Sequence, residues 1–293
     1  MTYLFRIDLG DGAPRLARGE SAEAPSELLP DDLTLDGLLA DTAETFGSAV
    51  REASAAGPVP DGFVLLPPVE SQEVWGSGVT YLRSRDARTE ESKLDADVYE
   101  RVYEAARPEV FFKSAGWRVR GPGDAIAVRA DSDWNAPEPE LALILAPDMR
   151  VVGLTIGNDV SSRRIEGDNP LYLPQAKIYD GSCALGPSIL VTDAPPPSVG
   201  IRMEIVRDGA VSFSGHASTS QMRRSFDELA SCLGWALAFP FGAVLLTGTG
   251  IVPPPSLTLR RGDLVRIWMD GLGVLENPVV EVGSATPIGE PPA

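Results

Sequence analysis

Short runs of apolar residues, separated by turn-forming residues, recur along most of the chain. Runs of this kind, rich in valine, isoleucine and leucine, are typical of β-strands. The dipeptide Asp208-Gly209 separates two of them and predicts a hairpin, because both central positions of such a turn favour positive φ. Few helices interrupt the runs, so we predict an α+β protein that is mostly β, with a curved or sandwich-like, mostly antiparallel sheet. The expected strands are residues 3–9, 63–66, 125–129, 140–145, 151–158, 189–192, 201–206, 210–213, 244–246, 264–268 and 279–282.

Three segments are expected to be helical instead. Residues 33–50 carry apolar side chains at helical spacing after an acidic start, which favours a helix N-terminus. A second helix is expected over residues 96–106. The third, residues 221–238, follows a run of hydroxyl residues suited to capping, and its apolar spacing places Trp235 on the face that packs in the core.

A cluster of glycines and prolines that ends at Pro67-Pro68 marks a boundary in the chain. After this boundary the sequence pattern changes, because short strand-like runs then dominate. We therefore predict a small α+β N-terminal domain over residues 1–68 and a larger domain over residues 69–293.

The composition is that of a folded, strongly acidic protein, with 42 acidic against 25 basic side chains and a formal charge of −17. This excess argues against a nucleic-acid partner, because phosphate contacts need a basic surface. No stretch approaches about 20 uninterrupted apolar residues, and the N-terminus lacks the pattern of a signal peptide, so neither a membrane span nor secretion is expected. With only two cysteines, a disulfide framework and cysteine-based zinc sites are excluded, and we expect a cytoplasmic protein.

The sharpest local feature is the pair Glu138 and Glu140 in an extended segment. Residues two apart project to the same side of a strand, and two crowded carboxylates repel unless a cation or a shared proton intervenes. Asp159 follows the strand at 151–158 and would add a third oxygen, a donor set that suits Mg²⁺ or Ca²⁺ better than zinc. The pattern alone leaves two interpretations open, a metal site or an ordinary solvated strand face.

An ordered series of short motifs over residues 72–283 resembles the fumarylacetoacetate hydrolase family. Within that family the chain looks most like the 2-keto-3-deoxy-D-arabinonate dehydratase branch. The resemblance implies a mixed or antiparallel β-sandwich roll of the family's C-terminal type behind a small N-terminal cap, and a homodimer or larger homo-oligomer. The motifs are Phe111-Phe112-Lys113, Gly121-Pro122-Gly123-Asp124, Glu138-Pro139-Glu140-Leu141, Gly157 to Arg163, Gln175-Ala176-Lys177, Leu185-Gly186-Pro187, Thr247-Gly248-Thr249 and Leu275-Glu276-Asn277-Pro278.

The resemblance also implies a divalent metal, Mg²⁺ with Mn²⁺ or Ca²⁺ as alternatives, held by Glu138, Glu140 and Asp159. A Lewis acid on the ketone oxygen of a 2-oxo acid would stabilise the enolate formed when a proton leaves C3. Lys177 matches the family's active-site lysine and would either offset negative charge or take that proton. Glu109 matches an acid/base glutamate of the dehydratase-like branch and could protonate the departing hydroxyl, although a solvent-facing role is the alternative.

Further matches fall on residues expected to bind substrate. Lys113 is either a pocket residue or a partner of the metal carboxylates, and the sequence does not decide between these. Arg163 and Gln175 match positions that line the pocket, while Arg163 could instead clamp an acidic residue of its own loop. The glycine turn over residues 247–249, which contains Thr247, Gly248 and Thr249, would present backbone N–H groups to the substrate carboxylate.

One departure from the family separates the candidate reactions. Hydrolytic members activate water with a histidine and a glutamate, whereas the equivalent stretch here, residues 80–86, has no histidine, and His216 lies far along the chain. Elimination needs only a base at C3, an acid at the leaving hydroxyl and the metal. We therefore expect a metal-dependent lyase that dehydrates a 2-keto-3-deoxy sugar acid to 2,5-dioxopentanoate. The alternatives are a hydrolase that cleaves a carbon–carbon bond in an acylpyruvate, and a non-catalytic protein that binds oxo acids.

Overall fold

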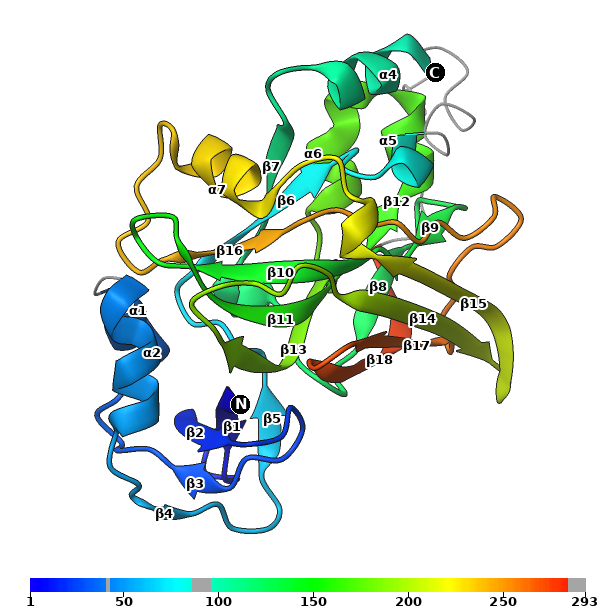
Figure 1. Cartoon of the computed structure of the whole chain (residues 1–293). Helices are drawn as coiled ribbons and strands as arrows, with labels where there is room; N and C mark the ends of the chain where they lie inside the picture. Colours follow the sequence, from blue (N-terminus) through cyan, green and yellow to red (C-terminus); the bar gives the residue numbers. More distant parts are fainter. Residues whose placement is uncertain (41–42, 86–95, 284–293) are drawn as a thin grey trace, which may run out of the picture.

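A computed structural model of the chain describes residues 1–40, 43–85 and 96–283. Two sheets, whose strands curve around a shared apolar core, dominate the part so described (Figure 1). The predicted class, mostly β with mixed sheets, is confirmed.

The larger sheet has eleven strands among the described residues, in the order β4-β3-β2-β1-β13-β11-β10-β16-β6-β7, with β5 paired to β1. Its pairings are antiparallel except for β16 with β6. The strands are β1 (Thr2–Asp8), β2 (Arg15–Gly19), β3 (Glu27–Leu28), β4 (Gly57–Pro58), β5 (Val64–Leu66), β6 (Glu73–Gly78), β7 (Glu109–Ala115), β10 (Pro139–Leu145), β11 (Val151–Asp159), β13 (Cys183–Val191) and β16 (Ala243–Leu246).

The second sheet, in the order β15-β14-β17-β18-β8, packs across the first. The turn between β14 and β15 is the predicted hairpin, and Asp208 and Gly209 have φ of +50° and +77°. A short pair, β9 with β12, lies beside it. The strands are β8 (Ile126–Arg129), β14 (Gly200–Arg207), β15 (Ala210–Ser218), β17 (Leu264–Met269), β18 (Gly273–Val282), β9 (Asn135–Ala136) and β12 (Ser161–Ser162).

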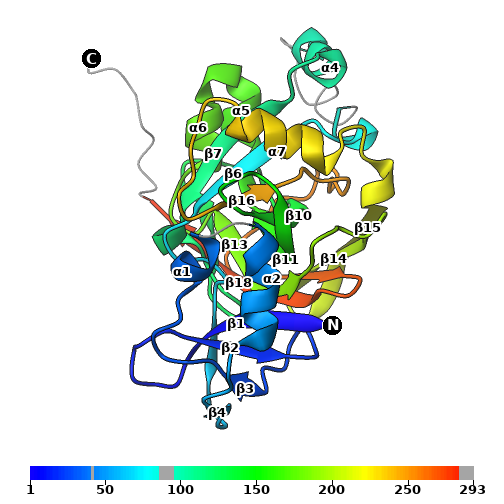
Figure 2. The same ribbon diagram turned by 60° about the vertical axis from the view of Figure 1, so that its left-hand side comes forward.

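Strand β10 shows why the sheets stack as they do, because all of its residues are buried. Leu141 and Leu143 face the core shared with the second sheet, whereas Ala142 and Ile144 face a core that includes α1 and α2. The N-terminal strands β1–β5 lie at the end of the molecule opposite α4, α5 and α6 (Figures 1 and 2). Because β1 hydrogen-bonds to β13, residues 1–68 share a sheet with the rest, and the domain boundary stays a prediction.

The helices differ from expectation mainly in their ends. The segment predicted as one helix over 33–50 holds α1 and α2, and residues 41–42 between them lie outside the described residues. The helix predicted over 221–238 is shorter, because the Ser225 side chain caps it at Glu228 N and it ends at Gly234. Trp235 is therefore not in the core but 86% exposed, and that prediction was wrong. The helices are α1 (Leu35–Leu39), α2 (Ala43–Glu52), α4 (Ala96–Glu104), α5 (Arg163–Asp168), α6 (Leu173–Lys177) and α7 (Phe226–Gly234), with 3₁₀ turns at Gly116–Arg118, Pro170–Tyr172 and Thr219–Gln221. No helix among the described residues is long and apolar enough to cross a membrane.

Candidate metal centre

Three carboxylates meet where β10 begins and β11 ends. The two strands pair antiparallel with Pro139 opposite Asn158, which brings Glu138 next to Asp159. The Asp159 N–H donates to the Glu138 carbonyl at 2.9 Å, and the Glu138 N–H donates to the Asn158 side chain at 3.2 Å. Glu140, two residues along β10, projects to the same side as Glu138, as the strand period predicts.

One carboxylate oxygen from each of Glu138, Glu140 and Asp159 lies within 4.8 Å of the others. The three residues are only 3%, 2% and 1% exposed. Burial, together with the charges of Asp159 and Glu138, raises the pKa of the Glu140 carboxyl well above its ordinary value of 4.5. A buried all-oxygen donor set with this much negative charge fits a hard divalent cation such as Mg²⁺. The solvated strand face, the other interpretation of the sequence, is excluded by this burial.

Lys177, the last residue of α6, reaches two members of this carboxylate trio. Its Nζ donates to Glu138 Oε2 at 2.6 Å and to Asp159 Oδ2 at 2.8 Å, and it lies 5.3 Å from the centre of the Phe111 ring. Arg163, the first residue of α5, places Nη2 2.7 Å from Glu138 Oε1. Both cations therefore hold the orientation of the carboxylates that would bind the metal.

Lys113 lies behind the trio and is completely buried on β7. Its Nζ pairs with Asp159 Oδ1 and donates to the carbonyl oxygens of Val160 at 3.0 Å and Lys177 at 2.6 Å. The sequence left two roles open for Lys113, a pocket residue or a partner of the metal carboxylates, and this geometry supports the second. It also ties the backbone that carries Lys177 to the backbone that follows Asp159.

A narrow pocket opens onto Glu138 and Glu140 of the trio, and Glu109, at the start of β7, also lines it. Gly78 makes room for this carboxylate, since a Cβ there would lie 2.0 Å from Glu109 Oε2. Val79, also in the wall, has φ of +52°, a strained conformation for a β-branched residue. The full lining is Ser77, Gly78, Val79, Ser84, Glu109, Phe111, Glu138, Glu140, Glu166, Leu173, Lys177, Gly248 and Thr249.

The predicted glycine turn contributes its backbone to this pocket. Gly248, with φ of +88°, donates its N–H to Glu140 Oε2 at 2.5 Å. The two neighbouring hydroxyl groups donate to backbone carbonyls: Thr247 to Leu141 at 2.9 Å and Thr249 to Ile251 at 3.3 Å. The turn therefore positions a metal carboxylate in addition to any contact with substrate.

Of the residues predicted to bind substrate, Lys113, Arg163, Thr247 and Gln175 do not line the pocket. Lys113 and Arg163 pair with carboxylates of the trio and Thr247 adjoins Gly248, whereas Gln175 lies on another surface. It is exposed and lines a separate surface hollow with Arg129 and Asp131. Gln175 and Lys177 stand two positions apart on α6, and residues at that spacing do not share a helix face. Its role in substrate binding stays a prediction.

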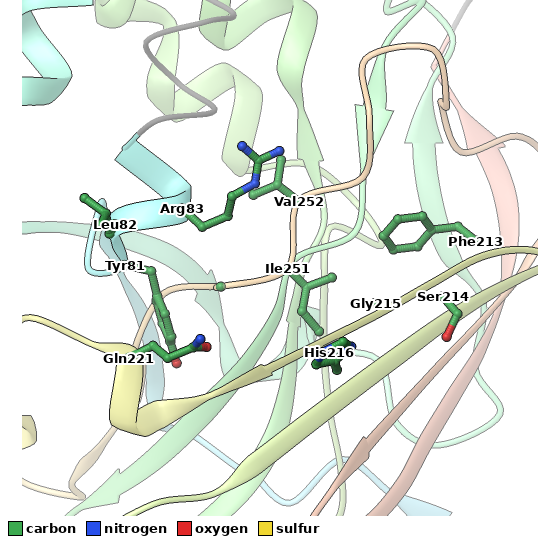
Figure 3. A pocket seen from close by; sticks show the side chains of 11 residues that line it. Tyr81, Leu82, Arg83, Phe213, Ser214, Gly215, His216, Gln221, Ile251 and Val252 are labelled. Atoms are coloured by element: carbon green, nitrogen blue, oxygen red, sulfur yellow. The ribbon is translucent and has the colours of Figure 1, made fainter.

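His216 also lies elsewhere. It is exposed on β15 and lines a larger hollow with Tyr81 and Arg83, shown in Figure 3, which shares no lining residue with the carboxylate pocket. The stretch without histidine, residues 80–85, runs between the two hollows, and Asp86 lies outside the described residues. Cys183 is buried, which raises the pKa of its thiol to about 12, so this thiol stays protonated near neutral pH.

Three polar residues of the pocket were missed at the sequence level: Ser77, Ser84 and Glu166. The Ser77 hydroxyl is buried and has no hydrogen-bond partner among the described residues. Glu166 stands three residues after Arg163, the spacing at which helical side chains share a face, and this was the available signal. Nothing in the sequence marked the two serines.

A family model described as the fumarylacetoacetate hydrolase C-terminal domain matches residues 74–280. The chain is 45% identical over 273 residues to a probable 2-keto-3-deoxyxylonate dehydratase of Haloferax volcanii, covering 86% of this chain and 94% of that protein. It is 46% identical over 217 residues to the 2-dehydro-3-deoxy-D-arabinonate dehydratase of Saccharolobus solfataricus, covering 72% and 73%. A solved 2-keto-3-deoxy-D-arabinonate dehydratase in complex with magnesium and 2,5-dioxopentanoate superposes with a TM-score of 0.82 at 35% identity, covering 97% of this chain and all of the other.

Proposed function

Because the chain belongs to the fumarylacetoacetate hydrolase family, we infer that it is a magnesium-dependent dehydratase of 2-keto-3-deoxy sugar acids. The observation that carries this inference is the buried trio Glu138, Glu140 and Asp159 with the Lys177 ammonium at 2.6 and 2.8 Å from two of its members. Two similar proteins act on 2-keto-3-deoxypentonates by name, and a third was solved with magnesium and 2,5-dioxopentanoate. We propose the same substrate class and product here.

A bound Mg²⁺ would supply Lewis-acid stabilisation of negative charge on the 2-oxo oxygen of the substrate. Arg163 and Lys113 hold Glu138 and Asp159 in place, so that the carboxylates need no rearrangement during the reaction. Lys177 is the base that takes the proton from C3, since its Nζ lies next to the carboxylates that would hold the metal. Glu109, which lines the same pocket, is the group that delivers a proton to the departing C4 hydroxyl.

Hydrolysis of an acylpyruvate has less support than water loss. Hydrolytic members of the family activate water with a histidine and a glutamate, and the chain's one histidine lines the other hollow. Dehydration uses only groups that this pocket contains, namely one lysine and carboxylates beyond the trio.

The test is incubation of the protein with a 2-keto-3-deoxypentonate and, separately, with an acylpyruvate, each with Mg²⁺ or with EDTA. Mass spectrometry should show loss of one water and an aldehyde from the first compound, only when Mg²⁺ is present. Two acids from the acylpyruvate, with no change in the sugar acid, would establish the hydrolase instead. Tight binding of either oxo acid without turnover at saturating Mg²⁺ would indicate a binding protein.

We further propose that the protein is cytoplasmic and forms a homodimer or a larger homo-oligomer, as the resemblance implies. Light scattering on the purified protein measures the second property directly. A monomer at assay concentration with full activity would contradict it.

A further inference from the structure

Helix α5 turns charged residues toward the interior. Its two buried residues are Arg163 and Glu166, 2% and 5% exposed, whereas Ile165 between them is only partly buried. Burial of charged side chains costs free energy, so a helix selected for packing alone would bury its apolar residue instead. The Arg163 guanidinium pairs with the metal carboxylate Glu138. Glu166 stands three residues later, at the spacing that places it on the same buried face of the helix.

Glu166 lines the pocket that opens onto the carboxylates of Glu138 and Glu140. Besides Glu138 and Glu140, the described residues of the lining include three acid/base side chains, Lys177, Glu109 and Glu166. They come from three different elements, α6, β7 and α5.

The proposed reaction, on which the following inference rests, needs more than one base. In the first stage the C3–H bond breaks, its electron pair forms the C3=C4 bond, and the C4 hydroxyl leaves with a proton as water. The intermediate is 5-hydroxy-2-oxopent-3-enoate. Lys177 at C3 and Glu109 at the leaving hydroxyl complete this stage.

The product 2,5-dioxopentanoate requires a second stage, an isomerisation without net loss of atoms. A base removes a proton from C5, and the electrons move to form C4=C5 while the 2-oxo group becomes an enolate. A proton then returns to C3, which leaves an enol at C4 and C5. Finally the C5 hydroxyl loses its proton and C4 gains one, which produces the aldehyde with no oxidant or reductant involved.

We propose that Glu166 is the acid/base residue of this second stage and takes the proton from C5. The assignment distributes three proton-transfer positions, C3, the C4 hydroxyl and C5, over the three acid/base side chains of the pocket. It also explains why α5 buries a carboxylate beside the arginine that positions the metal ligand.

The experiment compares the wild type with Glu166→Gln, which keeps the shape of the side chain but cannot accept a proton. The matched control is Asp168→Asn, the same change at an exposed position on the same helix, outside the pocket. Two rates are measured with Mg²⁺ in D₂O: exchange of the C3 protons of the sugar acid by NMR, and formation of the aldehyde. The conjugated intermediate is followed by its ultraviolet absorbance.

We expect Glu166→Gln to retain C3 exchange, to accumulate the conjugated enoate and to form aldehyde roughly 100-fold or more slowly. Asp168→Asn should match the wild type in both rates. Equal losses of exchange and aldehyde formation in Glu166→Gln would overturn the assignment, as would unchanged aldehyde formation. Glu109→Gln accumulating the enoate in its place would show that the two glutamates have the opposite roles.

If Glu166→Gln does not fold, Glu166→Asp keeps a carboxylate at a shorter reach. It should retain C3 exchange while aldehyde formation falls, and an equal fall in both rates would again refute the role. The wild type separates this inference from the proposed function. A wild type that forms no aldehyde contradicts the dehydratase, whereas an active wild type with an unaffected Glu166→Gln contradicts only the role of Glu166.

Discussion

Replacing Lys113 by methionine tests the ionic framework behind the carboxylate trio. The substitution removes a fully buried ammonium and with it the ion pair to Asp159 and two hydrogen bonds to carbonyl oxygens at 3.0 and 2.6 Å. Asp159 then keeps Lys177 as its cationic partner, at 2.8 Å. Removing one partner of a buried ion pair typically costs about 3–5 kcal/mol, because the remaining charge stays desolvated.

Differential scanning calorimetry at pH 7 with EDTA should measure this loss. For a chain of 293 residues it corresponds to a fall in melting temperature of roughly 5–8 °C. Saturating Mg²⁺ should stabilise Lys113→Met by more than it stabilises the wild type, since a divalent cation replaces part of the missing positive charge.

The matched control is Arg164→Met, which breaks an ion pair of similar length, 2.7 Å to Asp133, with the arginine side chain 50% exposed. Exposed pairs contribute about 0–1 kcal/mol, so this variant should melt within about 2 °C of the wild type. Equal melting temperatures for Lys113→Met and Arg164→Met would refute the assignment of a stabilising role to the buried lysine.

Two further substitutions and one chemical modification test other residues. Glu140→Gln should abolish Mg²⁺ binding in calorimetry and all activity. Because the pKa of Glu140 is raised in the metal-free fold, the protonated carboxyl stabilises that fold at low pH, and this stabilisation is lost as the pH rises above about 4.5. Glutamine stays neutral at every pH, so without metal Glu140→Gln should have a higher melting temperature than the wild type at pH 7. At pH 8 a thiol reagent should modify Cys232 in the native protein but not Cys183, which is buried and whose pKa of about 12 keeps it protonated. Both thiols should react after unfolding, and rapid reaction of two thiols in the native protein would contradict this. Gly248→Ala should lower the melting temperature by more than Gly123→Ala. Both glycines have φ above +80°, but only a Cβ at Gly248 would meet a neighbouring atom, Thr80 Oγ1, at 2.0 Å. Equal losses in the two variants would show that this contact relaxes.

Much of the carboxylate trio could be predicted because strand geometry is simple. The period of two places Glu138 and Glu140 on one side without knowledge of any partner strand. Asp159 was a candidate because it follows the strand at 151–158, but the pattern alone could not place it beside the pair. Its position depends on the register of β10 against β11, and several registers satisfy the same apolar pattern.

Helix ends and helix faces were harder to predict. Apolar spacing extends across residues 221–238, but the capping hydroxyl of Ser225 starts α7 later, and Trp235 then falls beyond its last turn. Gln175 and Lys177 match family motifs equally well, yet a rotation of about 200° between them on α6 sends their side chains to different surfaces. Whether a charged residue such as Glu166 is buried depends on tertiary packing, which the local pattern does not contain.

The charges around the trio suggest why the pocket contains two further carboxylates, Glu109 and Glu166. Lys113, Lys177 and Arg163 pair with Glu138 and Asp159, and these cations already balance the charges of the two carboxylates before any metal binds. A divalent cation that enters this balanced set adds positive charge in a buried space, which other anions must offset. Glu109, Glu166 and the carboxylate of a 2-oxo acid are the anions that can do so, and Mg²⁺ and substrate should therefore strengthen each other's binding.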